Sequence, residues 1–151
     1  MTTPLNNIRI LDLTTSYSGP IATMQLADFG AEVIKVEHYK SGDFSRKWEP
    51  KIDGKSLFYP PNNRNKKSIT LNLKSPEGKE IFKKLVKDAD VVVENYRGGT
   101  MNKLGLGYDV LKEINPSIIM ASLSGFGQTG PYSKRGAYSN IAEAMAGTMY
   151  M

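Results

Sequence analysis

Five short runs of mostly apolar residues recur along the chain, separated by longer segments of helical character. Short apolar runs rich in β-branched side chains are typical of buried strands. The predicted strands are residues 8–13, 32–37, 68–73, 90–94 and 117–122. The predicted helices are residues 21–29, 76–88 and 108–114, with a last helix that starts at Tyr138 and reaches the end of the chain.

Turn residues support several of these boundaries. Ser18-Gly19-Pro20 breaks the chain after the first strand, and Gly30 is placed to end the helix that follows. Ser75 and Pro76 predict an N-cap followed by a proline at the first helical position. The helix that they open is expected to turn three side chains inward, namely Ile81, Leu85 and Val86.

Strands that alternate with helices through short connections predict parallel βαβ units. The fold class is therefore α/β, a Rossmann-like doubly wound and mostly parallel sheet of about five strands. Residues 38–65 fit no regular pattern, and a loop of that length is usually functional or packs on a partner. The apolar stretch 144–151 has no polar tail, so we expect residues 1–151 to be one incomplete domain of a larger fold.

Composition and charge narrow the class of protein. The chain has no cysteine and a single histidine, His38, which excludes disulfides, thiolate nucleophiles and multi-histidine metal sites. Neither a signal peptide nor an apolar run of about 20 residues is present, so we expect a cytoplasmic protein without a membrane segment. The net charge of +5 favours an anionic partner.

Two basic clusters account for much of the excess charge. One is residues 64–67, and the other is the set of helical lysines Lys79, Lys83, Lys84 and Lys87. The helical lysines are best interpreted as a solvated helix face. Neither cluster carries the interleaved aromatic side chains of a single-strand binder, so a nucleic-acid partner is not expected.

Ligands of open α/β sheets bind beyond the carboxyl ends of the strands. Four segments follow predicted strands there: residues 14–20, 38–43, 95–99 and 124–131. Residues 125–130 match the G-x-G-x-x-G pattern, but they follow the fifth strand rather than the first, and Pro131 interrupts the helix start that a nicotinamide site needs. These glycines turn the chain or let the backbone approach a ligand.

The segment Asn95-Tyr96-Arg97-Gly98-Gly99 is followed by Lys103. A flexible glycine pair between two cations suits phosphate binding, and an ordinary strand-to-helix turn is the alternative. Asp12, near a strand end, is interpreted as a buried structural carboxylate with satisfied hydrogen bonds. His38 has no partner of its own kind and is placed at the surface or at the edge of a cofactor site.

Nine segments in order resemble the opening of class III (CaiB/BaiF-type) coenzyme A transferases. They cover nearly all of the chain, and each alone is a weak signal. They are residues 10–14, 18–20, 28–37, 41–43 with Arg46 and Trp48, 65–69, 71–78, 89–97, 104–108 and 124–131.

The resemblance implies an enzyme that moves CoA from an acyl-CoA to a carboxylic acid. An aspartate attacks the thioester, and aspartyl anhydride and aspartyl-CoA thioester intermediates follow. It also implies an interlocked homodimer without a metal, in which residues 1–151 form the N-terminal part of the large CoA-binding domain. The nucleophilic aspartate is expected beyond Met151, so we assign no catalytic residue here and expect no transferase activity from this chain alone.

The resemblance further implies which residues contact CoA, with Arg97 and Lys103 on phosphate. The full set is Tyr17, Ser18, His38, Leu71, Asn72, Lys74, Asn95, Tyr96, Arg97, Lys103, Tyr138 and Ser139. Two alternatives stay open: an α-methylacyl-CoA racemase-like isomerase, and a non-catalytic CoA-, nucleotide- or nucleic-acid-binding module. Ala137-Tyr138-Ser139 stands where such racemases carry Gly-His-Asp, which speaks against the first.

Overall fold

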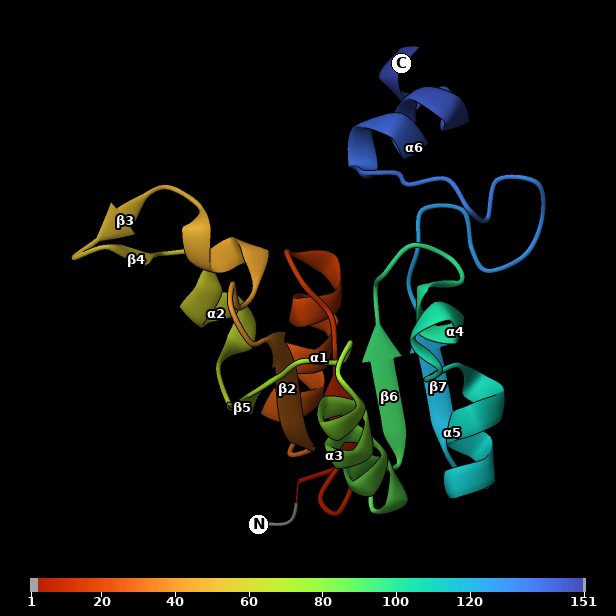
Figure 1. Ribbon diagram of the computed structural model, residues 1–151. Coiled ribbons are helices and arrows are strands. Elements are labelled where there is room, and N and C mark those ends of the chain that lie inside the picture. Colours follow the sequence, from red (N-terminus) through yellow and green to blue (C-terminus); the bar gives the residue numbers. More distant parts are fainter. Residues whose placement is uncertain (1–2, 151) are drawn as a thin grey trace.

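Five parallel strands form the central sheet of the computed structural model, which describes residues 3–150 (Figure 1). The strands lie side by side in the order β5-β2-β1-β6-β7. Their bounds are β1 Arg9–Asp12, β2 Glu32–His38, β5 Lys66–Leu71, β6 Val91–Glu94 and β7 Ile119–Ser122. This order confirms the doubly wound Rossmann-like sheet of five strands that the sequence predicts.

Helices cover both faces of the sheet, so the central strands are buried on both sides. The helices of the sheet body are α1 Ser18–Asp28, α3 Pro76–Lys87, α4 Thr100–Leu104 and α5 Tyr108–Ile114. Successive strand residues point to opposite faces, so neighbours such as Leu11 and Ile10 enter two different clusters. Leu11 joins Phe82, Val86 and Leu111 beneath α3 and α5, whereas Ile10 packs with Ala27 of α1.

Several element boundaries differ from the sequence prediction. Helix α1 begins at Ser18 and contains Gly19 and Pro20, because a proline is tolerated in the first turn of a helix. Strand β5 runs over 66–71 rather than 68–73, since it pairs along β2 from Val33 to His38. Helix α4 was not predicted.

The prediction that residues 38–65 form a purely irregular loop is wrong. The segment folds into four short elements: η1 Phe44–Lys47, β3 Lys51–Ile52, β4 Lys55–Ser56 and α2 Tyr59–Asn63. Strands β3 and β4 form a separate antiparallel hairpin. A hairpin with two-residue strands and a helix of five residues are too short for a periodic pattern to reveal.

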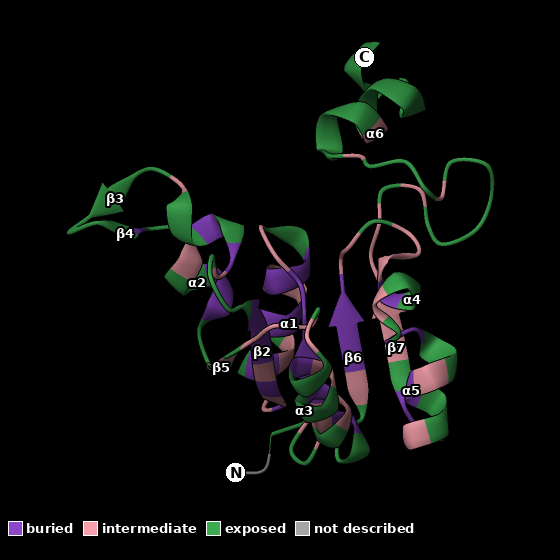
Figure 2. Cartoon of the chain, in the orientation of Figure 1, coloured by how far each residue is buried: buried purple, intermediate pink, exposed green. Residues whose placement is uncertain are grey.

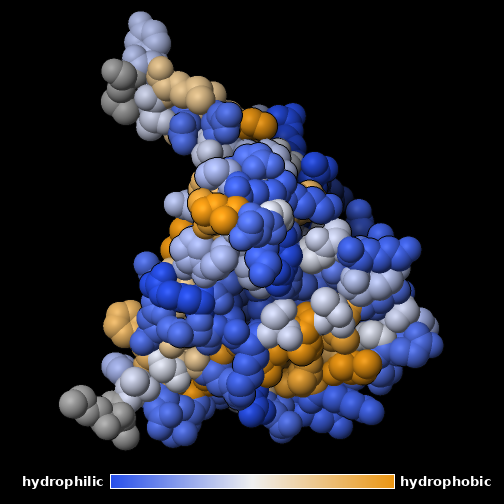
Figure 3. Space-filling view, turned by 90° about the vertical axis from the view of Figure 1, so that its left-hand side faces the viewer, coloured by the Kyte–Doolittle hydropathy of each residue, from blue (hydrophilic) through white to orange (hydrophobic). Residues whose placement is uncertain are grey.

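Helix α3 begins where its N-cap predicts, because the Ser75 hydroxyl accepts a hydrogen bond from the Gly78 N–H at 3.1 Å. Its inward face is set by Phe82 and Val86, both fully buried, whereas the predicted core residue Ile81 is 46% exposed. Beside it β5 is an edge strand of the sheet, with Ile69 and other half-buried apolar residues on its inner face. Apolar surface is visible on the side of the molecule where β5 forms the edge of the sheet (Figure 3).

The C-terminal segment stands away from the sheet. After β7 a long loop leads to α6 Ser139–Ala146 and η2 Thr148–Tyr150, and neither element has a buried residue (Figure 2). The exposed apolar side chains of α6 include Ile141 and Met145. Within residues 3–150, no helix combines the length and the apolar character that a membrane crossing requires.

Candidate functional site

The strand order reverses between β1 and β6, where the chain leaves β5 through α3 and returns to the other side of β1. Asn95, which directly follows β6, spans this point. Its side-chain oxygen accepts the Thr15 N–H at 2.9 Å, and its amide donates to the Thr15 carbonyl at 2.8 Å. Such a reversal is the usual ligand crevice of an open α/β sheet.

Asp12 lies under the loop that joins β1 to α1 and is fully buried. Its carboxylate accepts hydrogen bonds from the Thr14 N–H and hydroxyl, from Thr23 on α1, and from the Lys66 ammonium at 2.9 Å. The expectation of a satisfied structural carboxylate is confirmed. Burial lowers the pKa of Lys66, although the charge of Asp12 opposes that shift.

A second buried pair joins β2 to the segment after it. The Lys35 ammonium lies 2.9 Å from Asp43 Oδ2 and donates to the Thr14 carbonyl at 2.7 Å. Burial would raise the pKa of Asp43, but the charge of Lys35 and hydrogen bonds from Lys35 and Ser45 hold it below its ordinary value. The carboxylate therefore stays ionised in the interior.

Glu37, at the end of β2, binds several donors at once. Arg46 reaches both of its oxygens at 2.7 Å, and the Tyr59 hydroxyl, the Ser68 hydroxyl and the Asp43 N–H also donate to it. Burial alone would raise the pKa of Glu37, but these donors lower it to about 2. The Arg46 guanidinium also stacks 3.6 Å above the Tyr59 ring.

The turn after β6 carries Arg97, and helix α4, which follows that turn, carries Lys103. Arg97 and Lys103 are exposed, and neither has a carboxylate partner anywhere in residues 3–150. The glycine-rich loop packs against this turn, because a Cβ added at Gly136 would lie 2.8 Å from Arg97 Nε. A Cβ at Gly98 would lie 2.3 Å from the Ser133 carbonyl oxygen. Glycine at position 98 thus allows the close approach of the Ser133 backbone, and glycine at position 136 makes room for the Arg97 side chain.

Other predicted contact residues lie at the same edge of the sheet. Tyr17 is 54% exposed, and Ser18 is exposed at the start of α1. His38 is exposed at the end of β2, with its Nδ1 3.0 Å from the Ser41 hydroxyl. Lys74, exposed after β5, donates its N–H to the Asn72 side chain at 3.2 Å.

Three predicted residues are used by the fold itself. Tyr96 packs against the core cluster under α3, and burial, followed by the nearby charge of Glu94, raises the pKa of its hydroxyl to about 12. Leu71 packs against the same cluster. The Asn95 side chain is occupied by its two hydrogen bonds to the Thr15 backbone.

Tyr138 and Ser139 lie at the start of α6, away from the sheet edge. Tyr138 is 81% exposed, and the loop that precedes it touches the glycine-rich segment, because a Cβ at Gly125 would lie 2.5 Å from Ala137 Cβ. No hydrogen bond within residues 3–150 joins either side chain to the other predicted residues. A contact of both with CoA remains a prediction.

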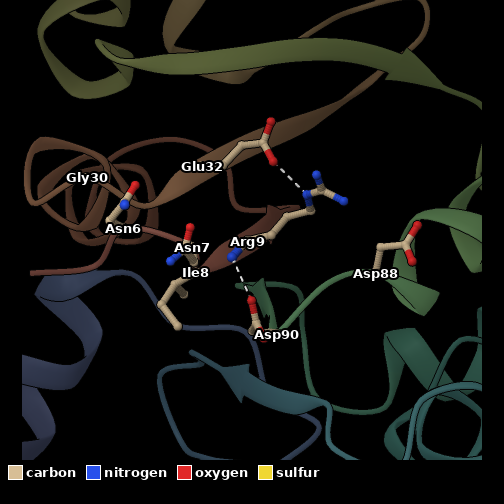
Figure 4. Close-up of a pocket in the computed structure, with 8 residues that line it drawn as sticks. All are labelled: Asn6, Asn7, Ile8, Arg9, Gly30, Glu32, Asp88 and Asp90. Carbon is tan, nitrogen blue, oxygen red and sulfur yellow. Dashed lines mark hydrogen bonds and ion pairs between the residues drawn. The ribbon is translucent and has the colours of Figure 1, made fainter. Parts of the chain in front are cut away.

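Two cavities lie outside this cluster of cations. One, of 360 Å³, is lined by Tyr17, Pro50, Leu57, Phe58, Pro61 and Asn62. The other, of 470 Å³, lies at the opposite end of β1, where Arg9 donates to Glu32 at 2.6 Å and the Arg9 N–H donates to Asp90 at 2.7 Å (Figure 4). Its charged groups largely pair with one another and leave no excess positive charge for a phosphate.

The basic cluster 64–67 is also neutralised. Arg64 pairs with Asp28, Lys66 with Asp12, and Lys67 with Glu32. Across the described residues, no three histidine, cysteine or carboxylate side chains gather in a way that would hold a metal ion. Arg97 and Lys103, by contrast, are not neutralised by any carboxylate of residues 3–150.

Comparison with known proteins places this geometry in a family. Residues 5–151 match the family model described as CoA-transferase family III. The chain is 50% identical over 149 residues to human succinyl-CoA:glutarate CoA-transferase, covering 98% of this chain and 34% of that protein. It is 46% identical to the beta subunit of succinyl-CoA–L-malate CoA-transferase from Chloroflexus aurantiacus, covering 99% of this chain and 37% of that subunit.

A solved structure shares both fold and sequence. A CaiB/BaiF family protein from Brucella suis superimposes with a TM-score of 0.91 at 40% identity, covering 99% of this chain and 40% of that one. The chain spans about a third of the length of the curated relatives that it matches. Because the family model matches almost every residue, the chain belongs to the CoA-transferase family III.

Proposed function

We propose that this chain forms the CoA-binding part of an enzyme that moves CoA from an acyl-CoA to a carboxylic acid. The observation that carries the proposal is the pair Arg97 and Lys103, which lies beside the strand reversal without any carboxylate partner in residues 3–150. Unpaired cations beside a glycine turn suit the phosphates of CoA. Tyr17, His38 and Lys74 extend the same edge toward the rest of the cofactor.

The backbone of the turn supports the same assignment. Among the described residues, the N–H groups of Arg97, Gly98 and Gly99 have no hydrogen-bond acceptor. Such groups together with a guanidinium provide the donors that phosphate oxygens need. We infer that Arg97 binds phosphate with its side chain and that the turn contributes backbone donors.

The chain's own carboxylates at this edge are poor candidates for the nucleophile. Asp12, Glu37 and Asp43 are each buried and held by cations and hydroxyls, and Glu94 is buried with its carboxylate on the Tyr96 N–H. A nucleophilic carboxylate has to reach the thioester carbon. We therefore propose that the reacting aspartate lies outside residues 1–151 of the whole enzyme.

The proposed reaction consists of four successive acyl transfers. The aspartate attacks the acyl-CoA, which releases CoA thiolate and leaves an aspartyl-acyl anhydride. The thiolate attacks the aspartyl carbonyl, which releases the donor acid and leaves an aspartyl-CoA thioester. The acceptor carboxylate then displaces the thiolate to form a second anhydride, and the thiolate attacks the acceptor acyl carbon, which regenerates the aspartate.

The names of the relatives suggest the substrates. Those relatives are named for succinyl-CoA with glutarate, D-citramalate or L-malate. We propose succinyl-CoA as donor and a dicarboxylic acid as acceptor. We further propose an interlocked homodimer, which would cover the exposed side chains Ile141, Met145 and Met149 of the C-terminal segment.

The test is a transfer assay on the full protein that carries this sequence. With succinyl-CoA as donor, we expect a new acyl-CoA from at least one of glutarate, malate or citramalate, and hydroxylamine should trap an aspartyl thioester. In deuterated water a 2-methylacyl-CoA should take up no deuterium at its α-carbon, because Tyr138 stands where a racemase has its histidine base. Rapid deuterium uptake without transfer would instead assign a racemase.

A further inference from the structure

The loop that joins β1 to α1 is held by three side chains: Lys35 on β2, Asp43 in the segment after β2, and Asn95 directly after β6. Among the backbone groups of its residues 14–16, the Thr14 carbonyl accepts from Lys35 at 2.7 Å, and the Ser16 N–H donates to Asp43 at 3.1 Å. From the other side, Asn95 binds both the N–H and the carbonyl of Thr15. Ser16 adopts a positive φ of 74°, a conformation that serine holds only when its surroundings impose it.

Lys35 and Asp43 act on this loop as one unit. The ammonium of Lys35 and the carboxylate of Asp43 lie 2.9 Å apart, with side chains 1% and 0% exposed. Asp43 Oδ1 also accepts from the Ser45 N–H at 2.8 Å and its hydroxyl at 2.7 Å, which fixes the carboxylate in place. A buried ion pair adds little net stability compared with apolar residues of similar volume, so stability alone does not account for it.

The loop presents groups that the fold does not use. Tyr17 is 54% exposed and its hydroxyl has no hydrogen bond in residues 3–150, while the preceding backbone is tied down on both sides. We propose that Lys35 and Asp43 are positioning residues, which hold the 14–16 backbone so that Tyr17 and Ser18 stand ready for CoA. This inference rests on the proposed function, because it takes CoA as the ligand of that edge.

Two double variants test the proposal without leaving a buried charge unpaired. Lys35→Met with Asp43→Ala removes both ties on the loop. Lys35→Met with Asp43→Asn restores only an acceptor for the Ser16 N–H. The control is Glu32→Gln, which breaks the ion pairs with Arg9 and Lys67 at the other end of the sheet.

Two readouts are taken on the full protein that carries this sequence, under conditions where each variant is folded. Hydrogen–deuterium exchange of the peptide 13–18 reports on the loop, and calorimetric titration reports on the Kd for CoA. In the double variant with Asp43→Ala we expect faster exchange and a Kd raised about tenfold, because a preorganised loop binds without an ordering cost. The double variant with Asp43→Asn should recover part of the slow exchange and part of the affinity, and Glu32→Gln should change neither.

The outcomes distinguish a failure of the positioning role from a failure of the proposed CoA binding. Unchanged exchange in the Asp43→Ala variant would overturn the positioning role, and faster exchange with a Kd within twofold of the parent would overturn its link to CoA. If the unmodified protein does not bind CoA, the proposed function fails instead. The exchange measurement still decides in that case whether Lys35 and Asp43 hold the loop.

Discussion

At the scale of single residues, the edge of the sheet depends on charges that are buried and paired. Glu37 is the clearest case, with a folded pKa of about 2 against an ordinary value of 4.5. A carboxyl group with a lowered pKa stabilises the fold fully above its ordinary pKa. That contribution is lost as the pH falls from about 4.5 toward 2, because the unfolded chain then binds the proton first.

Replacing Glu37 with glutamine should therefore matter most near neutral pH. The shift corresponds to a contribution on the order of 3 kcal/mol to the free energy of unfolding. Denaturant titrations at pH 7 and pH 3 measure it, and the difference between parent and Glu37→Gln should shrink at the lower pH. The control is Glu80→Gln on the surface of α3, whose pairing with Lys83 should contribute less than about 1 kcal/mol at either pH. A parent–Glu37→Gln difference that is equal at both pH values would contradict the assignment.

Residue chemistry was predicted best for Asp12, the last residue of β1. Asp12 was recognised as structural, and its hydrogen bonds confirm that interpretation. Lys35 and Lys66 were missed, because a lysine inside or beside an apolar strand reads as a surface residue until its partner is known. Their partners are supplied by segments up to 54 positions away, and no local pattern reveals such a pairing.

At the scale of elements, α3 shows how a cap determines a boundary. Replacing Ser75 with alanine removes the acceptor for the Gly78 N–H and should lower the free energy of unfolding by about 1 kcal/mol. Ser139→Ala is the matched control, because Ser139 begins α6 without a cap bond and should change stability by less than about 0.5 kcal/mol. Urea unfolding of the two variants measures both values. Equal effects would contradict the cap.

Periodicity predicted the long elements and failed on the short ones. Helix α5 has the predicted bounds, residues 108–114, whereas the five-residue α4 and the hairpin of β3 and β4 were not predicted. The inward face of α3 was also partly wrong. Phe82, not Ile81, fills the space between α3 and the sheet, because the tilt of a helix against its sheet decides which of two adjacent apolar side chains points inward.

At the scale of the whole molecule, the doubly wound parallel sheet could be predicted because parallel βαβ connections leave few arrangements. What the sequence could not predict is that the predicted site residues are divided between the edge of the sheet and helix α6. The edge of the sheet carries Arg97, Lys103 and the β1–α1 loop together, while Tyr138 and Ser139 stand on a helix without buried residues. Their placement relative to CoA depends on contacts that residues 3–150 do not supply.

The central claim is that CoA binds at the carboxyl edge of the sheet through Arg97 and Lys103. Calorimetric titration of the full protein with CoA tests it most directly, using Arg97→Ala, Lys103→Ala and, as control, Lys84→Ala on the exposed face of α3. Each charge-assisted contact to phosphate contributes roughly 1.5–3 kcal/mol, so either site variant should raise the Kd at least about tenfold while the control leaves it unchanged. A Kd unchanged in both site variants would contradict the claim.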